Sequence, residues 1–527
     1  MAQDSLDSDD YQRANAHPEE SMNTREQTRR LLLKSAAGVV AAQCLPHDAR
    51  ASATGLRQEW QQFKATSQYA SFRSAIALMR ANTDPLNPSS LAFWANVHVN
   101  HCPHGQPYFI AWHRGYLYHF ERQLRIVSGN PDLMLPYWDY YANATLPAEF
   151  TDPAPDNPLY LQRMGANVHA ALNLAPFAPA VFNFQRGTTN AFEPKIEDVH
   201  NPVHDLIGGI MSTMQSPLDP IFYLHHASID RLTHAWALPD GKGIPYSSYP
   251  FSSHDSNPYW AGSHVYATGL SMARYLTLDP AWLGIDYVDT AMPAALPAAR
   301  AAGQPAPAAA PLRRPPFVAF TPTPPGQRSA TRRSLGGIAQ PVFDRRSVSA
   351  RIRLAPGDAA DVARIVGVLR QKGEAGGEAG GGADGQTDRG IAVSAAPGAV
   401  KVVIDNALIG ELARRGGFFY ALYLNLPAQV DAPSARAQSW IGTLGAFQIA
   451  AASHHGPARL EFDVTELLAQ QEQPDFSTFS LSWVRVDGES PPAGVAIRVD
   501  EIRLELAFEA QPAPAPRKPA LQGWYGR

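Results

Sequence analysis

Two different patterns of hydrophobic and polar positions divide the chain. Between residues 54 and 290 apolar side chains recur at helical spacing, as at Phe72, Ile76 and Met79. From about residue 340 the pattern becomes an alternation over short runs, which is typical of β-strands. These runs are residues 347–354, 400–404, 418–424, 479–486 and 495–506. We therefore predict a mainly α-helical bundle with long loops, followed by a C-terminal antiparallel β-sandwich.

Composition places the boundaries between these regions. Residues 291–340 are rich in Ala and Pro, and such sequence buries too little apolar surface to fold alone, so we interpret it as a linker. A length of 527 residues also favours more than one domain. The predicted segments are an N-terminal signal, a helical domain, a linker, a β-sandwich and a Pro-rich tail, at residues 1–53, 54–290, 291–340, 341–510 and 511–527.

The first 53 residues have the layout of an export signal. Arg29-Arg30 precedes an apolar run, and Ala51-Ser52-Ala53 supplies a cleavage site with small residues. A twin-arginine signal of this kind exports a protein that has already folded. We expect a periplasmic or secreted protein; the alternative is a short amphipathic helix beside a disordered tail.

Charge and cysteine content exclude several other classes. The formal net charge is −4 and no basic run stands out, so neither nucleic acid nor an anionic membrane surface is a favoured partner. No apolar stretch after the signal is long enough to span a bilayer. Of the two cysteines, Cys44 lies in the signal, so the mature chain keeps only Cys102 and cannot form an internal disulfide.

Two groups of histidines carry the candidate chemistry. They are His98, His104 and His113 in the first group, and His200, His204 and His226 in the second. His200 and His204 are four residues apart, so on a helix both imidazoles project from one face. A lone buried histidine is more often a hydrogen-bonded core residue. The combined spacings, however, predict two sites of three nitrogen donors each, a set that suits copper, zinc or iron.

Three motifs around these histidines resemble one known family. They are C-P-H-(eight residues)-H-R at 102–114, H-N-P-V-H at 200–204 and D-P-I-F-Y-L-H-H-A-S-I-D-R at 219–231. Through them residues 90–290 resemble the type 3 copper proteins: tyrosinases, catechol oxidases (polyphenol oxidases) and the related hemocyanins. The resemblance implies a bacterial member with a C-terminal cover domain.

The resemblance also implies a set of copper ligands. One copper ion would be held by His98, His104 and His113, and the other by His200, His204 and His226. In the pair His225-His226 the family's ligand corresponds to the second residue. Dioxygen is the implied co-substrate of the copper pair.

Three further residues receive roles from the same resemblance. Several members carry a thioether between a cysteine and the second ligand of the first copper, and Cys102-Pro103-His104 matches that pattern. In tyrosinase-like members a glutamate and an asparagine hold a water that deprotonates the phenol, and Glu197 and Asn201 stand at similar positions. The alternatives are a buried free thiol at Cys102 and an ordinary surface role for Glu197.

Charged residues beside the motifs are expected to form buried polar networks that orient the ligand helices. They are Arg114, Glu121, Asp139, Asp230 and Arg231.

The implied function is that of a tyrosinase, which hydroxylates small monophenols and oxidises o-diphenols to o-quinones. The alternatives are a catechol oxidase that acts on o-diphenols only, and a hemocyanin-like protein that binds O2 reversibly. A dinuclear zinc or iron hydrolase is disfavoured because such sites usually include bridging carboxylates, which the two histidine groups lack.

In latent members of the family the C-terminal domain covers the copper pocket with a plug residue. We expect the same arrangement here. The candidate plugs are Phe418, Phe419 and Tyr420, or Trp524 and Tyr525 in the tail.

Overall fold

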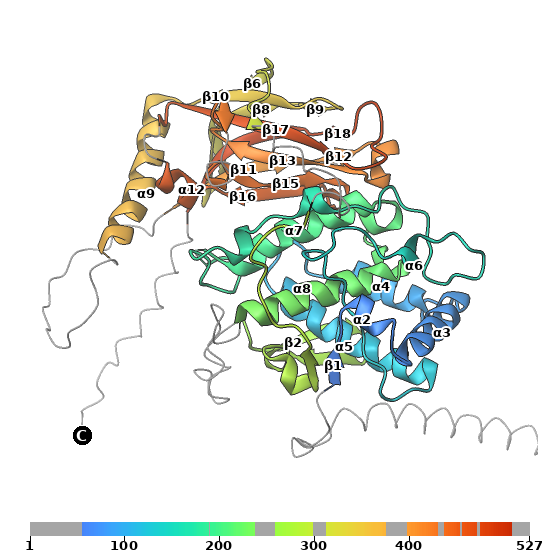
Figure 1. Ribbon diagram of the computed structural model, residues 1–527. Helices are drawn as coiled ribbons and strands as arrows, with labels where there is room; N and C mark the ends of the chain where they lie inside the picture. The colour runs from blue at the N-terminus through green and yellow to red at the C-terminus, as the bar shows by residue number, and fades with distance from the viewer. Residues whose placement is uncertain are drawn as a thin grey trace, which may run out of the picture.

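The computed structural model describes residues 55–188, 190–237, 259–298, 312–375, 398–430, 437–453, 456–471 and 475–508. The predicted export signal and the Pro-rich tail lie outside these residues, as do the candidate plugs Trp524 and Tyr525. The described chain forms a helical domain and a β-rich domain stacked against each other (Figure 1). Within the described ranges, no helix is both long and apolar enough to cross a bilayer.

The helical domain follows the predicted spacing of apolar residues. Its helices are α2 (Trp60–Phe63), α3 (Gln68–Ala81), α4 (Leu91–His101), α5 (Phe109–Ser128), α6 (Ala148–Thr151), α7 (Phe192–Ile207) and α8 (Ile221–Ala237). Phe72, Ile76 and Met79 on α3 are fully buried, as expected for one face of an amphipathic helix. Two pairs of short strands complete the domain: β1 (Gly55–Arg57) with β4 (Ile285–Tyr287), and β2 (Ser263–Ala267) with β3 (Leu270–Ala273).

The β-rich domain, called the cover domain below, contains two larger antiparallel sheets. One has the strand order β10 (Val348–Arg353), β17 (Thr478–Asp487), β13 (Phe418–Leu424), β15 (Trp440–Gly445). The other has the order β16 (Arg459–Asp463), β11 (Ala399–Asp405), β19 (Glu501–Ala507), β8 (Arg332–Ala339), β6 (Thr321–Thr323), with β7 (Gly326–Ser329) also paired to β8. Short strands β9 (Val342–Phe343), β12 (Leu408–Ile409) and β18 (Ile497–Arg498) form a third sheet, and β5 (Leu312–Arg313) pairs with β14 (Gln429–Val430).

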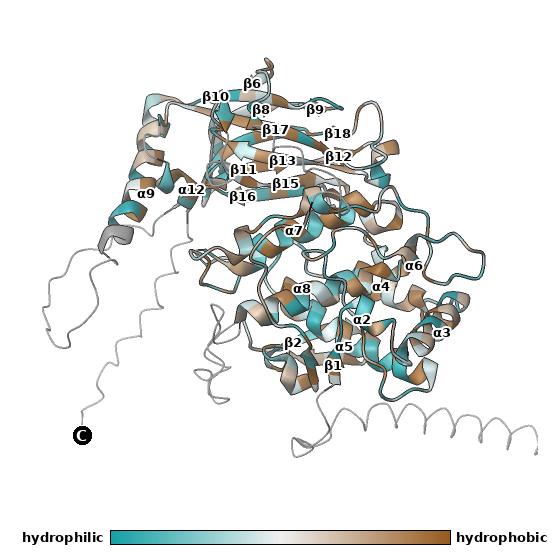
Figure 2. Cartoon of the chain, viewed as in Figure 1, coloured by the Kyte–Doolittle hydropathy of each residue, from teal (hydrophilic) through white to brown (hydrophobic). Residues whose placement is uncertain are grey.

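Residues from both larger sheets share one apolar core, so the predicted β-sandwich is confirmed. Helices α9 (Pro356–Ala375) and α12 (Thr465–Gln470) lie together beside this sandwich in Figure 1, and α11 (Ala446–Ala452) directly follows β15. Hydrophilic and hydrophobic segments alternate along the strands, as Figure 2 shows.

Strand β13 connects the two domains because both of its faces are buried. Phe418, Tyr420 and Leu422 belong to the core of the cover domain, whereas Phe419 and Tyr423 belong to the core of the helical domain. Successive side chains of a strand point to opposite faces, so one strand contributes to both cores. Helix α7 packs against β13 and β15, and Figure 1 shows it on the side of the helical domain that faces the sheets.

The predicted linker is partly wrong. Residues 312–339 fall within its boundaries but form strands β5, β6, β7 and β8. The prolines that indicated a linker are compatible with β6 because it pairs on one side only, with β8, at the edge of its sheet. Arg332–Ala339 pairs along its whole length with β19. The cover domain therefore begins well before residue 341.

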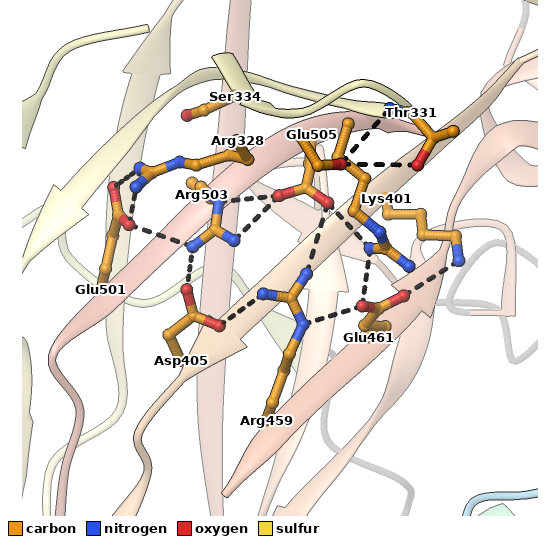
Figure 3. A network of polar contacts seen from close by, with 12 residues as sticks. Arg328, Thr331, Ser334, Lys401, Asp405, Arg459, Glu461, Glu501, Arg503 and Glu505 are labelled. Atoms are coloured by element: carbon orange, nitrogen blue, oxygen red, sulfur yellow. Dashed lines mark hydrogen bonds and ion pairs between the residues drawn. The ribbon is translucent and has the colours of Figure 1, made fainter. Parts of the chain in front are cut away.

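The second sheet also carries a network of ion pairs (Figure 3). Its members are Arg328, Arg332, Lys401, Asp405, Arg459, Glu461, Glu501, Arg503 and Glu505. Glu505 and Arg503 are almost completely buried and form a salt bridge of 2.8 Å. The network joins β7, β8, β11, β16 and β19.

Candidate metal centre

Four helices bring the six predicted ligands together. His98 lies on α4 and His113 on α5, while His104 belongs to the segment that joins these helices. His200 and His204 lie on α7, and His226 lies on α8. Helix α7 ends at Gly208, whose φ of 66° is left-handed, a conformation that a glycine adopts without strain.

In the first group the side chains of His98, Cys102, His104 and His113 each offer one possible ligand atom, all within 4.8 Å of one another. Contacts between Nδ1 and backbone carbonyl oxygens fix the orientation of two of these rings. Nδ1 of His98 lies 2.7 Å from the carbonyl oxygen of Met214, and Nδ1 of His113 lies 2.8 Å from that of Phe109. An Nδ1–H that donates to a carbonyl leaves Nε2 with a free lone pair, which is the usual state of a metal-binding imidazole.

The second group has the same construction. Nδ1 of His204 lies 2.7 Å from the carbonyl oxygen of Met211, and Nδ1 of His200 lies 2.9 Å from Oδ1 of Asn201. Nε2 of His200 lies 3.0 Å from Nε2 of His204 and 3.1 Å from Nε2 of His226. Three Nε2 atoms thus converge on one point.

The two groups face each other. The rings of His113 and His226 are stacked with centroids 4.1 Å apart, and those of His104 and His200 with centroids 5.7 Å apart. Burial lowers the pKa of all four imidazoles well below its ordinary value, and the neighbouring histidines lower it further. The rings are therefore neutral near pH 7, as metal binding requires. A set of neutral imidazoles without a carboxylate suits a copper pair.

His225 also lies near the second group, although the sequence assigned the ligand role to His226. A ligand atom of His225 falls within the 4.8 Å group formed with His200, His204 and His226. Its ring stacks on that of His200 with a centroid distance of 5.0 Å. The ring of His226 stacks on that of His113, so His226 lies between the two groups. The ring of His225 instead contacts that of Tyr140, with centroids 5.6 Å apart. This placement favours His226 as the third donor.

Cys102 lies among the rings of the first histidine group. Its Sγ is 3.6 Å from Nε2 of His104 and 3.4 Å from Nε2 of His113. Burial, followed by the nearby charge of Glu197, raises the pKa of the thiol well above its ordinary value. The thiol is therefore protonated in the structure, and its position is compatible with a later bond to His104.

Glu197 and Asn201 lie one helical turn apart on α7, so their side chains occupy one face. Both are buried. Glu197 accepts a hydrogen bond of 2.7 Å from the backbone N–H of Gly105, next to His104, and forms an ion pair with Arg186. Burial raises the pKa of Glu197, and the Arg186 guanidinium opposes that rise. The alternative of a simple surface glutamate is therefore wrong.

Buried ion pairs hold the ligand helices in place, as predicted. Arg114, next to His113 on α5, donates to Asp230 on α8 at 2.6 Å. Arg57 on β1 donates to Glu121 on α5 at 2.9 Å and forms an ion pair with Asp230 at 3.4 Å. Burial would raise the pKa of Asp230, but Arg114 and Arg57 reverse the effect and lower it. A second pair, Arg231 with Asp139 at 3.0 Å, involves the next residue of α8.

A phenylalanine of the cover domain lies over the histidines. The ring of Phe447, on α11, stacks on the imidazole of His204 with centroids 4.0 Å apart and an interplanar angle of 18°. It also contacts His104 edge-on at 5.0 Å and His200 at 5.4 Å. Phe447 therefore touches both histidine groups and is itself fully buried.

The predicted plug residues are therefore wrong for the described part of the chain. Phe418 and Tyr420 point into the cover domain's own core, because alternate residues of β13 face opposite ways. Phe419 faces the helical domain, but the cover-domain ring that contacts the histidines is that of Phe447. Nothing in the sequence around Gly445-Ala446-Phe447 indicates this position, since it depends on how the two domains pack.

Comparison with known proteins agrees with this geometry. Residues 57–171 and 154–238 match the family model for the common central domain of tyrosinase. Tyrosinase HcTyr1 of Hahella sp. (strain CCB-MM4) is 30% identical over 243 residues, which cover 38% of this chain and 51% of that protein. A G-type hemocyanin of Enteroctopus dofleini, units Oda to Odg, is 31% identical over 177 residues, which cover 28% of this chain and 6% of that protein.

The alignment thus spans about half the length of HcTyr1 and a small part of the hemocyanin. Among solved structures, latent apple tyrosinase aligns with a TM-score of 0.47 at 19% identity, covering 86% of this chain and 98% of that one.

The match of residues 57–171 and 154–238 to the tyrosinase central domain and the two facing histidine groups together support a type 3 copper protein of the tyrosinase and polyphenol oxidase kind. The family predicted from the three motifs is confirmed. Its relatives include both tyrosinases and a hemocyanin, so membership alone does not decide the reaction.

Proposed function

We propose that the protein is a tyrosinase that uses O2 to hydroxylate small monophenols and to oxidise o-diphenols to o-quinones. The tyrosinase central domain and the two sets of convergent imidazoles support a copper-dependent oxidoreductase. We assign His98, His104 and His113 to one copper and His200, His204 and His226 to the other. When bound, the copper pair supplies the electrons that reduce O2 and open positions that a phenol can approach.

The observation that favours hydroxylation is the pair Glu197 and Asn201 on one face of α7. A phenol has a pKa of about 10, so a monophenol needs a nearby base before it reacts. Glu197 lies beside His104 through the Gly105 N–H, and Asn201 contacts His200. A water held between these two side chains would pass the phenol proton to Glu197. Burial raises the pKa of Glu197, and the ion pair with Arg186 opposes that rise.

A comparison of two substrates tests this role. Wild-type and Glu197→Gln chains, both loaded with copper, would be assayed on a monophenol and on the matching catechol. We expect Glu197→Gln to lose roughly a hundredfold in monophenol hydroxylation, the range for a lost general base, with catechol oxidation nearly unchanged. Asp198→Asn, the neighbouring acid on α7, serves as the control. Equal losses on both substrates would favour a positional role for Glu197 and overturn the proposal.

The similarity to a hemocyanin supports a second candidate, reversible O2 binding without turnover. An assay for quinone formation separates the two functions. Steady production of o-quinone contradicts the carrier, whereas O2 binding with no quinone from any phenol, in a chain whose pocket is open, contradicts the oxidase.

We further propose that the wild-type chain is latent because Phe447 occupies the place of the phenol ring. Its contacts with His104, His200 and His204 support this assignment.

Two predictions from the sequence are also proposed here. The first is a thioether between Cys102 and His104, which mass spectrometry would detect as the loss of two hydrogen atoms. The second is twin-arginine export to the periplasm or medium. Changing Arg29 and Arg30 to lysine would then retain the protein in the cytoplasm.

A further inference from the structure

Asp205, the residue that follows His204, connects the helical domain to the cover domain. Its side chain is almost completely buried. The carboxyl oxygens accept hydrogen bonds from the backbone N–H groups of Ala446 and Phe447, the latter at 2.8 Å. Among the described residues, no arginine, lysine or histidine forms an ion pair with it. Burial raises the pKa of Asp205 to about 8, and a carboxyl group accepts these bonds whether or not it is charged.

The backbone of Asp205 makes a second contact with the cover domain. Its carbonyl oxygen accepts a hydrogen bond of 2.6 Å from the N–H of Gly417. This carbonyl belongs to the last turn of α7, where the helix itself has no N–H to donate to it. Two segments of the cover domain that are far apart in sequence, around Gly417 and around Phe447, therefore converge on one residue.

Both segments carry glycine where they approach Asp205. A Cβ on Gly445 would lie 1.8 Å from Oδ2 of Asp205, which is far inside contact distance. A Cβ on Gly416 would lie 2.6 Å from the carbonyl oxygen of Asp205, and the φ of Gly416 is +72°. The cover domain thus fits closely around both polar groups of this residue.

The hydrogen bonds also complete the start of α11. The first N–H groups of a helix have no partner within it, and Gly445 has no side chain to supply one. Asp205 supplies the acceptor from the other domain. If the two surfaces separated only slightly, donors and acceptor would all lose their partners while still excluded from water, which is costly. The contact therefore favours a fully closed state or a fully open one.

We propose that Asp205 is the latch that holds the cover domain closed, because it fixes the segment Gly445–Phe447 and so keeps the Phe447 ring on His204. This inference deepens the proposed latency and rests on it for its effect on activity. Asp205 acts here as a positioning residue. Asp205 directly follows His204, a proposed copper ligand, so one turn of α7 carries both that ligand and the residue that positions Phe447.

The test breaks the contact from each side in the full-length chain. Asp205→Ala removes the acceptor, and Gly445→Ala forces the cover-domain segment away without changing any residue of α7. Gly367→Ala is the matched control, because its Cβ meets nothing within 4 Å. Glu489→Ala is the control for a different hydrogen bond between the domains, which Glu489 accepts from the backbone N–H of Ala166 at 2.8 Å.

Two measurements distinguish the contact made by Asp205 from its proposed effect on enzyme activity. Hydrogen exchange of peptides spanning residues 440–453 is measured on the copper-free chain, and the initial rate on a bulky catechol is measured on the copper-loaded chain. We expect both Asp205→Ala and Gly445→Ala to increase exchange in this segment and to raise the rate roughly tenfold. The two controls should resemble the wild type in both measurements.

The outcomes are distinguishable. Unchanged exchange in Gly445→Ala, or an equal effect from Glu489→Ala, overturns the latch. If Phe447→Ala raises the rate but Gly445→Ala does not, Phe447 is a plug that Asp205 does not hold. If exchange increases in both latch variants while even Phe447→Ala leaves the rate unchanged, the contact holds the domains together and the proposed latency is wrong. If Asp205→Ala does not fold, the results for Gly445→Ala alone test the proposed latch.

Discussion

The ring of Phe447 lies almost parallel to the imidazole of His204, with centroids 4.0 Å apart. The two residues belong to different domains, and their contact is the point at which the cover domain reaches the proposed copper centre. Offset stacking of this kind stabilises the pair by about 0.5–1.5 kcal/mol beyond the burial of apolar area. The contact therefore adds to the stability of the arrangement in which Phe447 covers the histidines.

Replacing Phe447 with alanine should open the pocket to substrate. The variant loses the stacked contact and the buried ring, so we expect the rate of catechol oxidation to rise roughly tenfold or more, as a barrier lower by about 1.4 kcal/mol would give. The effect should be larger for bulky catechols than for small ones. Phe476→Ala, a half-buried phenylalanine packed against the cover domain's own core, is the control. Equal activation in both variants would show that general loosening of the domain is the cause.

Replacing His226 or His225 with alanine should separate a ligand from its neighbour. His226 stands between the two histidine groups, while His225 packs against Tyr140. We expect His226→Ala to lose about half of the bound copper and all oxidase activity, because two imidazoles seldom suffice for a tight site. His225→Ala should keep its copper content. The reverse pattern in metal analysis would assign the third donor to His225.

Replacing Asp230 with asparagine should destabilise the helical domain. The change leaves the guanidinium of Arg114 buried without its charge partner, and breaking such a pair costs about 3–5 kcal/mol. Chemical unfolding followed by circular dichroism would measure the loss. Arg364→Gln, which removes an exposed pair with Asp361 in the cover domain, should leave stability almost unchanged. Similar losses in both variants would mean that the buried network does not hold the ligand helices.

The charge network of Figure 3 predicts how the cover domain responds to acid. Burial would raise the pKa of Glu461, but hydrogen bonds from Lys401, Arg332 and Arg459 lower it to about 2. In the unfolded chain the pKa of a glutamate is about 4.3. Because the folded value is the lower one, the stability that Glu461 contributes is complete above about pH 4.3 and is lost as the pH falls towards 2.

The matching experiment compares wild type with Glu461→Gln in acid unfolding. We expect the variant to be less stable near pH 6 and to show a weaker dependence on pH between 4.3 and 2, because a glutamine does not titrate. Parallel unfolding curves for the two proteins over this range would contradict the assignment.

The regular elements could be predicted from the sequence because burial patterns follow local geometry. The strand predicted at 418–424 is found at Phe418–Leu424, and that predicted at 479–486 is found at Thr478–Asp487. The histidine groups could also be predicted from the sequence, since the spacing of His200 and His204 places them on one helix face. Alternation and helical periodicity act over a few residues, so they are visible in a single sequence.

Contacts between distant segments could not be predicted in this way. The pairing of Phe447 with His204, and of Asp205 with Gly417 and Gly445, depends on the packing of two separately folded domains. The strands within the predicted linker were missed because their prolines lie at a sheet edge, where the missing N–H costs nothing. His225 and His226 differ in role only through the direction each takes from α8.

Metal analysis of the full-length chain tests whether the two histidine groups form a dicopper centre. Such a centre holds two metal ions per chain, one for each histidine group, and both are copper. We therefore expect protein produced with excess copper to contain two copper ions, and His104→Ala and His200→Ala each to contain about one. Zinc in place of copper, or a single ion in the wild type that both variants lose completely, would contradict a dicopper centre.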